Sequence, residues 1–262
     1  MPIPSSSSGE MPFLDHLEEL RWRIIYALIG VLIGIVVGAY FSFGYDILRP
    51  LQQPLLPYLE PGQRLTVLSP MDGFTIRLQI AFVIGLTVAA PIIGYQFWAF
   101  LSPALHKPEK RVALPFLFFA ALLFVGGVAL SWFFVMPMTL EFFHRLNGDT
   151  LQAQYTATAY FGFATNMALA FGLAFELPLL LVALSALGIL SARTLNKSRR
   201  YAVVLIFIAS ALISPGDAIT ATLAMAVPLY LLYELAIVAA FMIERRRDRV
   251  REREAAAEGT PG

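Results

Sequence analysis

The chain has 262 residues, of which 58% are hydrophobic and 14% charged, and its mean hydropathy is +0.70. Soluble domains average roughly 45–50% apolar and about 25% charged residues, so this composition excludes an ordinary water-soluble globule. The 21 phenylalanines and 10 tyrosines exclude intrinsic disorder, and the absence of cysteine excludes a disulfide scaffold, thiolate catalysis and zinc–thiolate sites. The net charge of +1 says little by itself. The composition indicates an integral membrane protein.

Two segments are predicted before the first membrane span. Residues 1–11 are rich in proline and serine, which predicts a disordered segment. Apolar side chains recur at helical spacing from Phe13 to Ile24, which predicts an amphipathic helix lying at the membrane interface and leading into the first span. The apolar run at 24–44 lacks a small-residue cleavage site, so we expect a retained anchor rather than a cleavable signal peptide.

Six apolar stretches qualify as membrane spans, because a bilayer core of ~30 Å needs about 20 helical residues. The fifth reaches only about 21 Å, and the turn signal Pro215–Gly216–Asp217 joins it to the sixth. We therefore predict an all-α integral membrane protein with six transmembrane helices, of which the fifth and sixth are short. The predicted spans are 24–44, 78–101, 112–136, 160–187, 201–214 and 218–241.

Prolines lie inside or at the edge of nearly every predicted span. Each removes a helical hydrogen bond and favours a kink. Several kinks together favour a curved assembly of helices over a straight bundle. The prolines concerned are Pro91, Pro115, Pro137, Pro178 and Pro228.

The distribution of lysine and arginine predicts the orientation, because basic loops stay in the cytoplasm. Basic residues gather before span one, after spans two and four, and after span six, whereas the opposite loops hold few. We expect a multi-pass protein of the bacterial cytoplasmic (inner) membrane with both termini in the cytoplasm. Residues 1–244 form a single membrane domain in this interpretation, and 245–262 form a charged cytoplasmic tail.

Histidine placement argues against a membrane enzyme. His16, His106 and His144 all lie outside the predicted spans, so an intramembrane Ser–His dyad or a histidine-built metal site lacks its parts. No HExxH, GxSxG, Walker A or GxGxxG stretch occurs. We expect no catalysis, no metal, no cofactor and no nucleic-acid partner.

One acidic residue, Glu176, lies near the middle of span four, where a charge costs on the order of 2.5–3.5 kcal/mol by insertion scales. Two interpretations stay open. The carboxyl is a functional group facing protein or water, or it is protonated and hydrogen-bonded to a neighbour such as Gln96 or Thr165. Gln96 itself favours a helix–helix hydrogen bond, and Glu234 in span six is interpreted in the same way.

Carboxylates also gather at the predicted cytoplasmic surface. Before span one, Glu19 pairs with Arg23 at i,i+4 and Glu18 with Arg21 at i,i+3 in the simplest interpretation. After span two, Glu109 is neutralised by the basic residues at 107–111, or it binds an incoming cation. A guanidinium suits such a site because its planar fork gives bidentate, charge-assisted bonds.

Four segments in order resemble TatC, the polytopic receptor subunit of the twin-arginine protein translocase. They are HLEELRWR before span one, YQFWAFLSPALHKPEKR after span two, FGLAFELP in span four and SPGD before span six. The resemblance implies recognition of paired arginines in the signal peptides of folded export substrates. It implies that Glu19, Arg21, Phe100 and Glu109 bind the signal peptide, with the two carboxylates forming the arginine-binding patch.

The resemblance also implies the rest of the machinery. Pro54 matches a family position that is important for transport. Glu176 matches a carboxyl that faces a concave groove within the membrane, and Asp217 matches an acid on the turn between the last two spans. Ser214 falls where the family docks a partner helix. The implied partners are the single-span TatA and TatB subunits, further copies of the receptor and membrane lipid. The implied fold is a cupped arrangement of six helices, with transport driven by the proton-motive force.

The alternative function is a small-solute or proton-coupled transporter that uses Glu176 as its carrier. Such a protein normally places several polar groups at mid-membrane facing one cavity. This chain has one deep acid and a cluster of charges at the cytoplasmic surface, which favours the receptor.

Overall fold

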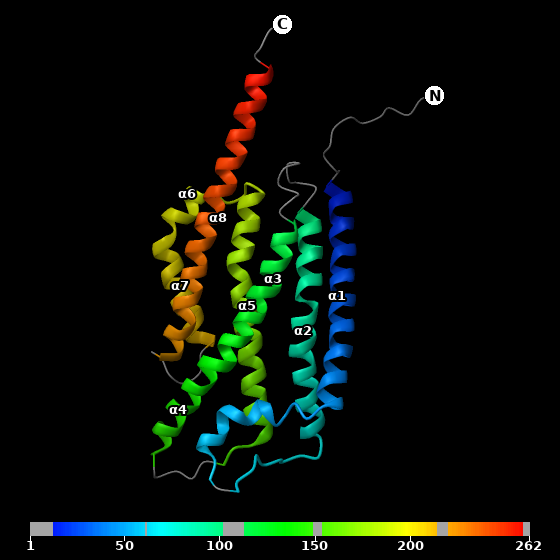
Figure 1. Ribbon diagram of the computed structural model, residues 1–262, viewed down its shortest axis with the longest axis vertical. Helices are drawn as coiled ribbons and strands as arrows, with labels where there is room; N and C mark the ends of the chain where they lie inside the picture. Colours follow the sequence, from blue (N-terminus) through cyan, green and yellow to red (C-terminus); the bar gives the residue numbers. More distant parts are fainter. Residues whose placement is uncertain (1–12, 61, 102–112, 149–153, 214–219, 259–262) are drawn as a thin grey trace, which may run out of the picture.

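The computed structural model describes residues 13–60, 62–101, 113–148, 154–213 and 220–258 (Figure 1). Their regular structure is helical, apart from a single β-bridge between Thr66 and Thr156. This confirms the all-α prediction. The elements are α1 (Phe13–Gly44), the 3-10 helix η1 (Pro50–Tyr58), α2 (Asp72–Leu101), α3 (Ala113–Leu130), the π-helix η4 (Ser131–Val135), α4 (Met136–Asn147), α5 (Ala157–Ala186), α6 (Ala192–Lys197), α7 (Arg199–Ile213) and α8 (Thr220–Glu258).

Five described helical stretches are long and apolar enough to cross a membrane. They correspond to the first four predicted spans and the sixth. The predicted fifth span is α7, whose 15 residues extend about 22 Å. The sixth helix was expected to be short, and this was wrong: α8 has 39 residues because its apolar span continues without a helix breaker into the arginine- and glutamate-rich segment.

The start of α1 also differs from the expectation. Residues 13–24 do not lie flat at an interface, because α1 is one straight helix of 32 residues (Figure 1). No proline or glycine interrupts it near Ile24, so the hydrogen-bonded ladder continues. A helix of this length extends about 48 Å, which exceeds the ~30 Å apolar core of a bilayer. Its first turns therefore project beyond the apolar layer.

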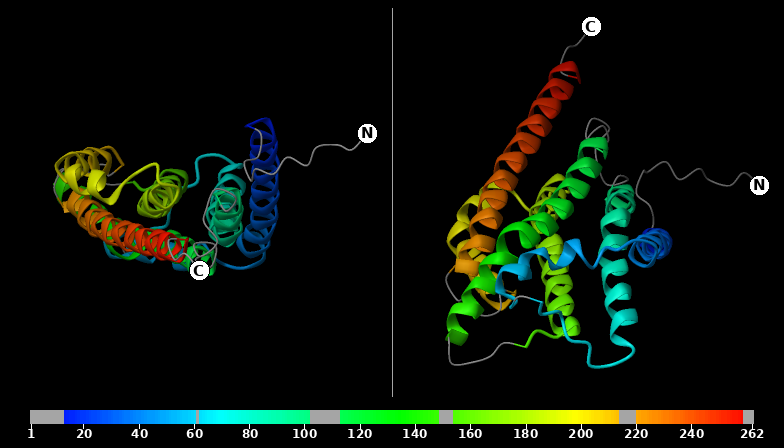
Figure 2. Two further views of the ribbon diagram at one scale, coloured as in Figure 1. Left: turned by 90° about the horizontal axis from the view of Figure 1, so that it is seen from above. Right: turned by 60° about the horizontal axis from the view of Figure 1, so that its bottom comes forward.

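The helices stand in a curved row instead of a closed bundle (Figure 2). α1 packs against α2, α2 against α3 and α5, α5 against α8, and α8 against α7. α5 is central and the most buried helix of the row. α1 begins and α8 ends on the same side of the molecule, which we call the terminal end (Figure 1).

Glycines set the close contact between α1 and α2. A Cβ atom at Gly34 would collide with the carbonyl oxygen of Gly85, and one at Gly38 with the carbonyl oxygen of Ala81. Small residues that bring two backbones together are a common way to join helices in a membrane. This contact fixes which residues of α1 and α2 lie at the same height.

Three of the five prolines lie in helix interiors, as the kink interpretation requires: Pro91 in α2, Pro178 in α5 and Pro228 in α8. Pro115 and Pro137 lie in the first turns of α3 and α4. Pro137 follows the π-helix η4, which joins α3 to α4 in one oblique path. A π-turn and a proline at one point are a recognised cause of helix bending.

η1 and the loops around it close the end opposite to the termini. The Tyr160 hydroxyl of α5 donates a hydrogen bond to the carbonyl oxygen of Leu51 at 2.8 Å, and Leu55 is fully buried. Between α1 and α2, the Ser42 hydroxyl donates to the carbonyl oxygen of Arg77 at 2.8 Å, and the Arg77 guanidinium donates back to the carbonyl oxygen of Ser42. This end is thereby tied to three helices.

Candidate functional site

Three polar side chains connect α1 and α2 near the terminal end. The Arg23 Nη2 atom donates a hydrogen bond to Glu19 Oε1 at 3.0 Å, and its Nη1 atom donates to Gln96 Oε1 at 3.4 Å. Both charged side chains are largely covered, with exposed fractions of 29% for Arg23 and 18% for Glu19. We call Glu19, Arg23 and Gln96 the α1–α2 bridge.

The bridge confirms two predictions from the sequence. Glu19 pairs with Arg23 at i,i+4, and Gln96 makes a helix–helix hydrogen bond. The other predicted pair is wrong: both Glu18 and Arg21 are exposed, and no ion pair joins them in the described structure. Arg21 lies on a different face of α1 from Arg23, because two residues along a helix turn it by about 200°.

Phe100 lies one helical turn beyond Gln96, at the end of α2. Its half-buried ring packs against a core cluster that includes Trp98, Phe116 and Ala183. The cluster joins α2, α3 and α5, so this aromatic side chain has a rigid support close to the α1–α2 bridge. Three further predicted residues, Glu109, Ser214 and Asp217, lie outside the described residues.

Glu176 lines a pocket of about 290 Å³ between α2, α3 and α5. It is the one ionisable residue of a lining that otherwise consists of apolar side chains, such as Ile93, Phe97 and Phe124. Gln96 and Thr165, the expected neighbours, are not its partners. Gln96 accepts from Arg23 on the side facing α1, and the Thr165 hydroxyl donates to the Phe161 carbonyl oxygen at 2.7 Å.

A second pocket of similar volume lies nearer the opposite end. Its lining comes from α2, α5, the region of η4 and the segment leading into η1, and it is also largely apolar, with Ile80, Trp132 and Phe161 among its residues. Helices α2 and α5 therefore carry two apolar hollows along their length, and Glu176 is in the one nearer the terminal end.

Pro54 lies inside η1, far from the α1–α2 bridge. Its neighbour Leu55 belongs to the core cluster of the opposite end, so Pro54 sits in the layer that closes this end. Tyr58, the last residue of η1, contacts the His144 ring at a centroid distance of 5.1 Å. Burial, with a smaller effect from the nearby Glu141 carboxylate, raises the pKa of the Tyr58 phenol.

The sequence predicted a helix–helix hydrogen bond for Glu234, and its contact with Arg199 of α7 confirms it, but the partners of α8 could not be assigned. Glu234 accepts hydrogen bonds from Arg199 Nη2 and the Tyr230 hydroxyl, each at 2.7 Å. Further along, Glu244 Oε1 accepts from the backbone N–H of Ala192 at 2.7 Å, and Arg247 Nη2 donates to the Ala186 carbonyl oxygen at 2.6 Å. The partners in α5, α6 and α7 are 35 to 61 residues away in the sequence, so no local pattern identifies them.

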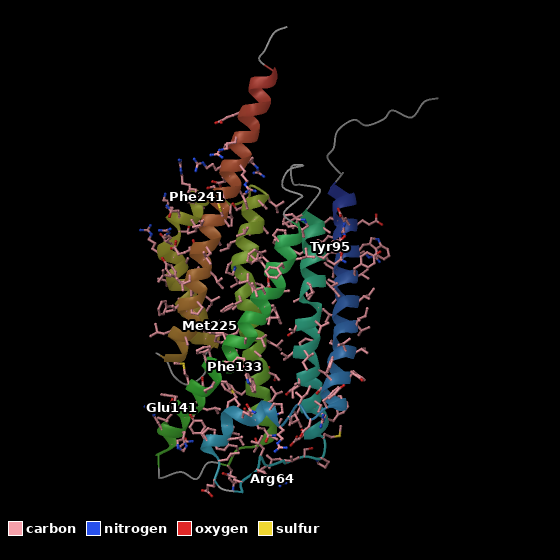
Figure 3. All side chains as sticks on the ribbon, viewed as in Figure 1. Arg64, Tyr95, Phe133, Glu141, Met225 and Phe241 are labelled. Carbon is pink, nitrogen blue, oxygen red and sulfur yellow. The ribbon has the colours of Figure 1, made fainter. Side chains whose placement is uncertain are left out.

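Charge is distributed unevenly between the two ends. Described basic residues of α1, α6, the start of α7 and the extension of α8 lie at the terminal end. Arg64 and Glu141 lie at the opposite end, far from Tyr95 and Phe241 (Figure 3). This arrangement agrees with the basic asymmetry read from the sequence.

Fold and site together define a polytopic α-helical membrane protein whose basic residues are concentrated at one end. The family model of the Sec-independent protein translocase protein TatC matches residues 15–228. TatC of Desulforapulum autotrophicum is 35% identical over 244 residues, covering 93% of this chain and 89% of the relative. TatC of Escherichia coli K12 is 33% identical over 245 residues, covering 93% of this chain and 94% of the relative.

Solved structures agree with the sequence relatives. A crystal structure of the twin arginine translocase receptor TatC superposes with a TM-score of 0.71 at 35% identity, covering 87% of this chain and 99% of the solved one. The chain belongs to the TatC family. It is a multi-pass inner-membrane component of twin-arginine protein translocation.

Proposed function

We propose that this chain is the receptor that binds twin-arginine signal peptides of folded proteins at its cytoplasmic face. With single-span TatA and TatB subunits, and driven by the proton-motive force, it translocates these proteins across the membrane. In this proposal several copies associate in the receptor complex within the lipid bilayer. The chain itself carries out no chemical reaction.

The observation that carries the proposal is the guanidinium already bound at Glu19. The Arg23–Glu19 contact is charge-assisted, 3.0 Å long and largely covered, so this carboxylate lies in surroundings that accept a guanidinium. A signal-peptide arginine presents the same group. Family resemblance adds Glu109 as the second carboxylate, and two carboxylates match two arginines.

The remaining residues take supporting roles. Arg21 and Phe100 contribute to the peptide-binding surface, Phe100 through a ring supported by the cluster of α2, α3 and α5. Pro54, Gln96, Glu176 and Asp217 act in transport or in holding the structure, and Ser214 contributes to docking a partner helix.

The positive-inside rule supports the orientation. Basic residues such as Arg193, Arg199 and Arg245 lie at the terminal end, and lysine and arginine near spans are retained in the cytoplasm. We therefore place both termini and the α1–α2 bridge on the cytoplasmic side, where signal peptides arrive.

The pocket around Glu176 favours the receptor over the alternative, a small-solute or proton-coupled transporter. One ionisable group in an apolar lining does not provide the several polar contacts that a solute carrier needs. Solute uptake by the purified chain in liposomes that is lost in Glu176→Gln would establish the transporter instead.

A complementation experiment tests the proposal. This chain is expressed with its cognate TatA and TatB in bacteria that lack their own TatC, together with a folded fluorescent protein behind a twin-arginine signal peptide. We expect export by wild type, severe loss of export with Glu19→Gln, and retained export with the matched control Glu141→Gln at the opposite end. Equal export with and without the chain would contradict the proposal.

A further inference from the structure

We propose that Arg23 is an internal competitor for the signal peptide: it occupies Glu19 in the resting protein, and the incoming arginine displaces it toward Gln96. This inference rests on the proposed function, since it assigns Glu19 as the arginine site. It makes Arg23 and Gln96 positioning residues that set the affinity of that site.

The geometry places the guanidinium between two acceptors. Arg23 reaches the Glu19 carboxylate at 3.0 Å with one terminal nitrogen and the Gln96 amide oxygen at 3.4 Å with the other. The first bond is shorter and charge-assisted, and such bonds are roughly twice as strong as neutral ones. In this resting arrangement the carboxylate is therefore the preferred partner and the amide a secondary one.

An arginine that binds Glu19 must share or take over the carboxylate. The Arg23 guanidinium then needs another acceptor, because its exposed fraction is only 29% and a covered charge without partners is costly. Gln96 is already in contact with the second nitrogen of Arg23. A small shift of the side chain toward α2 therefore keeps Arg23 hydrogen-bonded during the exchange.

The exchange predicts a gain of affinity when the competitor is removed. Arg23→Gln should tighten the binding of a synthetic twin-arginine signal peptide by on the order of three- to tenfold, the range expected for a partly covered ion pair. A twin-lysine peptide should gain by the same factor, because releasing Arg23 costs the same for either ligand. If Arg23 merely held Glu19 in place, Arg23→Gln would instead weaken the binding of the peptide.

Gln96→Leu should weaken binding of both peptides, since the displaced guanidinium loses its acceptor. In the Arg23→Gln background the same Gln96→Leu change should have no effect. The double-mutant cycle thus isolates the exchange from any general effect of Gln96 on the packing of α2.

The experiment measures peptide affinity with the full chain in lipid nanodiscs. Arg193→Gln is the matched control, because Arg193 is an exposed arginine of the same end and its loss changes net charge equally. Arg23→Lys provides a second variant, expected to give a smaller gain, if Arg23→Gln does not fold. Tighter binding with Arg23→Gln and unchanged binding with Arg193→Gln would support the exchange.

Weaker binding with Arg23→Gln, or an equal gain with Arg193→Gln, would overturn it. Failure of the proposed function gives a different result: the wild-type chain would then not prefer the twin-arginine peptide over the twin-lysine one, whatever stands at position 23.

Discussion

At the scale of single residues, part of the site could be predicted from the sequence. The Glu19–Arg23 pair follows from i,i+4 spacing, because those positions share a helix face. The Gln96 contact could not be assigned to Arg23, since the residues are 73 positions apart and their meeting depends on the relative height of α1 and α2. For Glu176 the sequence placed an acid near the middle of a span, but it supplied the wrong neighbours, because the half-buried carboxyl lines an apolar pocket.

Glu176 supports a prediction that separates binding from transport. Glu176→Ala should leave signal-peptide affinity within about twofold of wild type and reduce export strongly, because the carboxyl lies in an apolar pocket separate from the α1–α2 bridge. Peptide affinity and export of a folded reporter are measured on the same variant. Leu177→Ala is the control, since Leu177 lines the same pocket without a charge. Normal export by Glu176→Ala would remove its role in transport.

At the scale of elements, hydropathy located the spans because each is an apolar run, but it did not give their ends. α8 continues past the apolar span because its arginines and glutamates favour helix, and its Glu244 and Arg247 bond to the ends of α6 and α5. α1 likewise continues past its apolar span, because no helix breaker interrupts it. The contacts of Glu244 and Arg247 join segments that are distant in the sequence, so the local sequence pattern does not predict them.

The α1–α2 contact yields a prediction about stability and binding together. Gly34→Leu should lower the thermal unfolding midpoint, at a cost of about 1–3 kcal/mol for overpacking, because any side chain at Gly34 meets the backbone of Gly85. It should also weaken peptide binding, since the heights of Glu19 and Gln96 depend on this contact. Gly126→Leu is the control: a Cβ atom at Gly126 meets nothing within 4 Å. Equal effects of the two substitutions would contradict the role given to the glycines.

At the scale of the whole molecule, the curved row of helices leaves α1 and α7 at its two ends (Figure 2). The prolines predicted curvature, but the order of the row depends on which faces pack together, and that information lies in contacts such as those of α5 with α2, α3 and α8. α7 extends only about 22 Å, so we expect the bilayer to be thinner around it.

Orientation is testable because the chain has no cysteine of its own. A single cysteine introduced at the exposed residue Arg64 should react with a membrane-impermeant maleimide added outside the inner membrane. A cysteine at Arg193, exposed at the terminal end, should react only after the membrane is opened. The reverse pattern would place the termini outside and remove the α1–α2 bridge from the side where signal peptides arrive.

The most direct measurement is the affinity of a fluorescent twin-arginine signal peptide for the purified full chain, beside a twin-lysine version. Wild type is compared with Glu19→Gln/Glu109→Gln. We predict tight, arginine-selective binding by wild type and loss of that selectivity in the double variant, because the guanidinium loses both carboxylates. Equal affinity for the two peptides in wild type, or undiminished selectivity in the double variant, would contradict a carboxylate-based receptor.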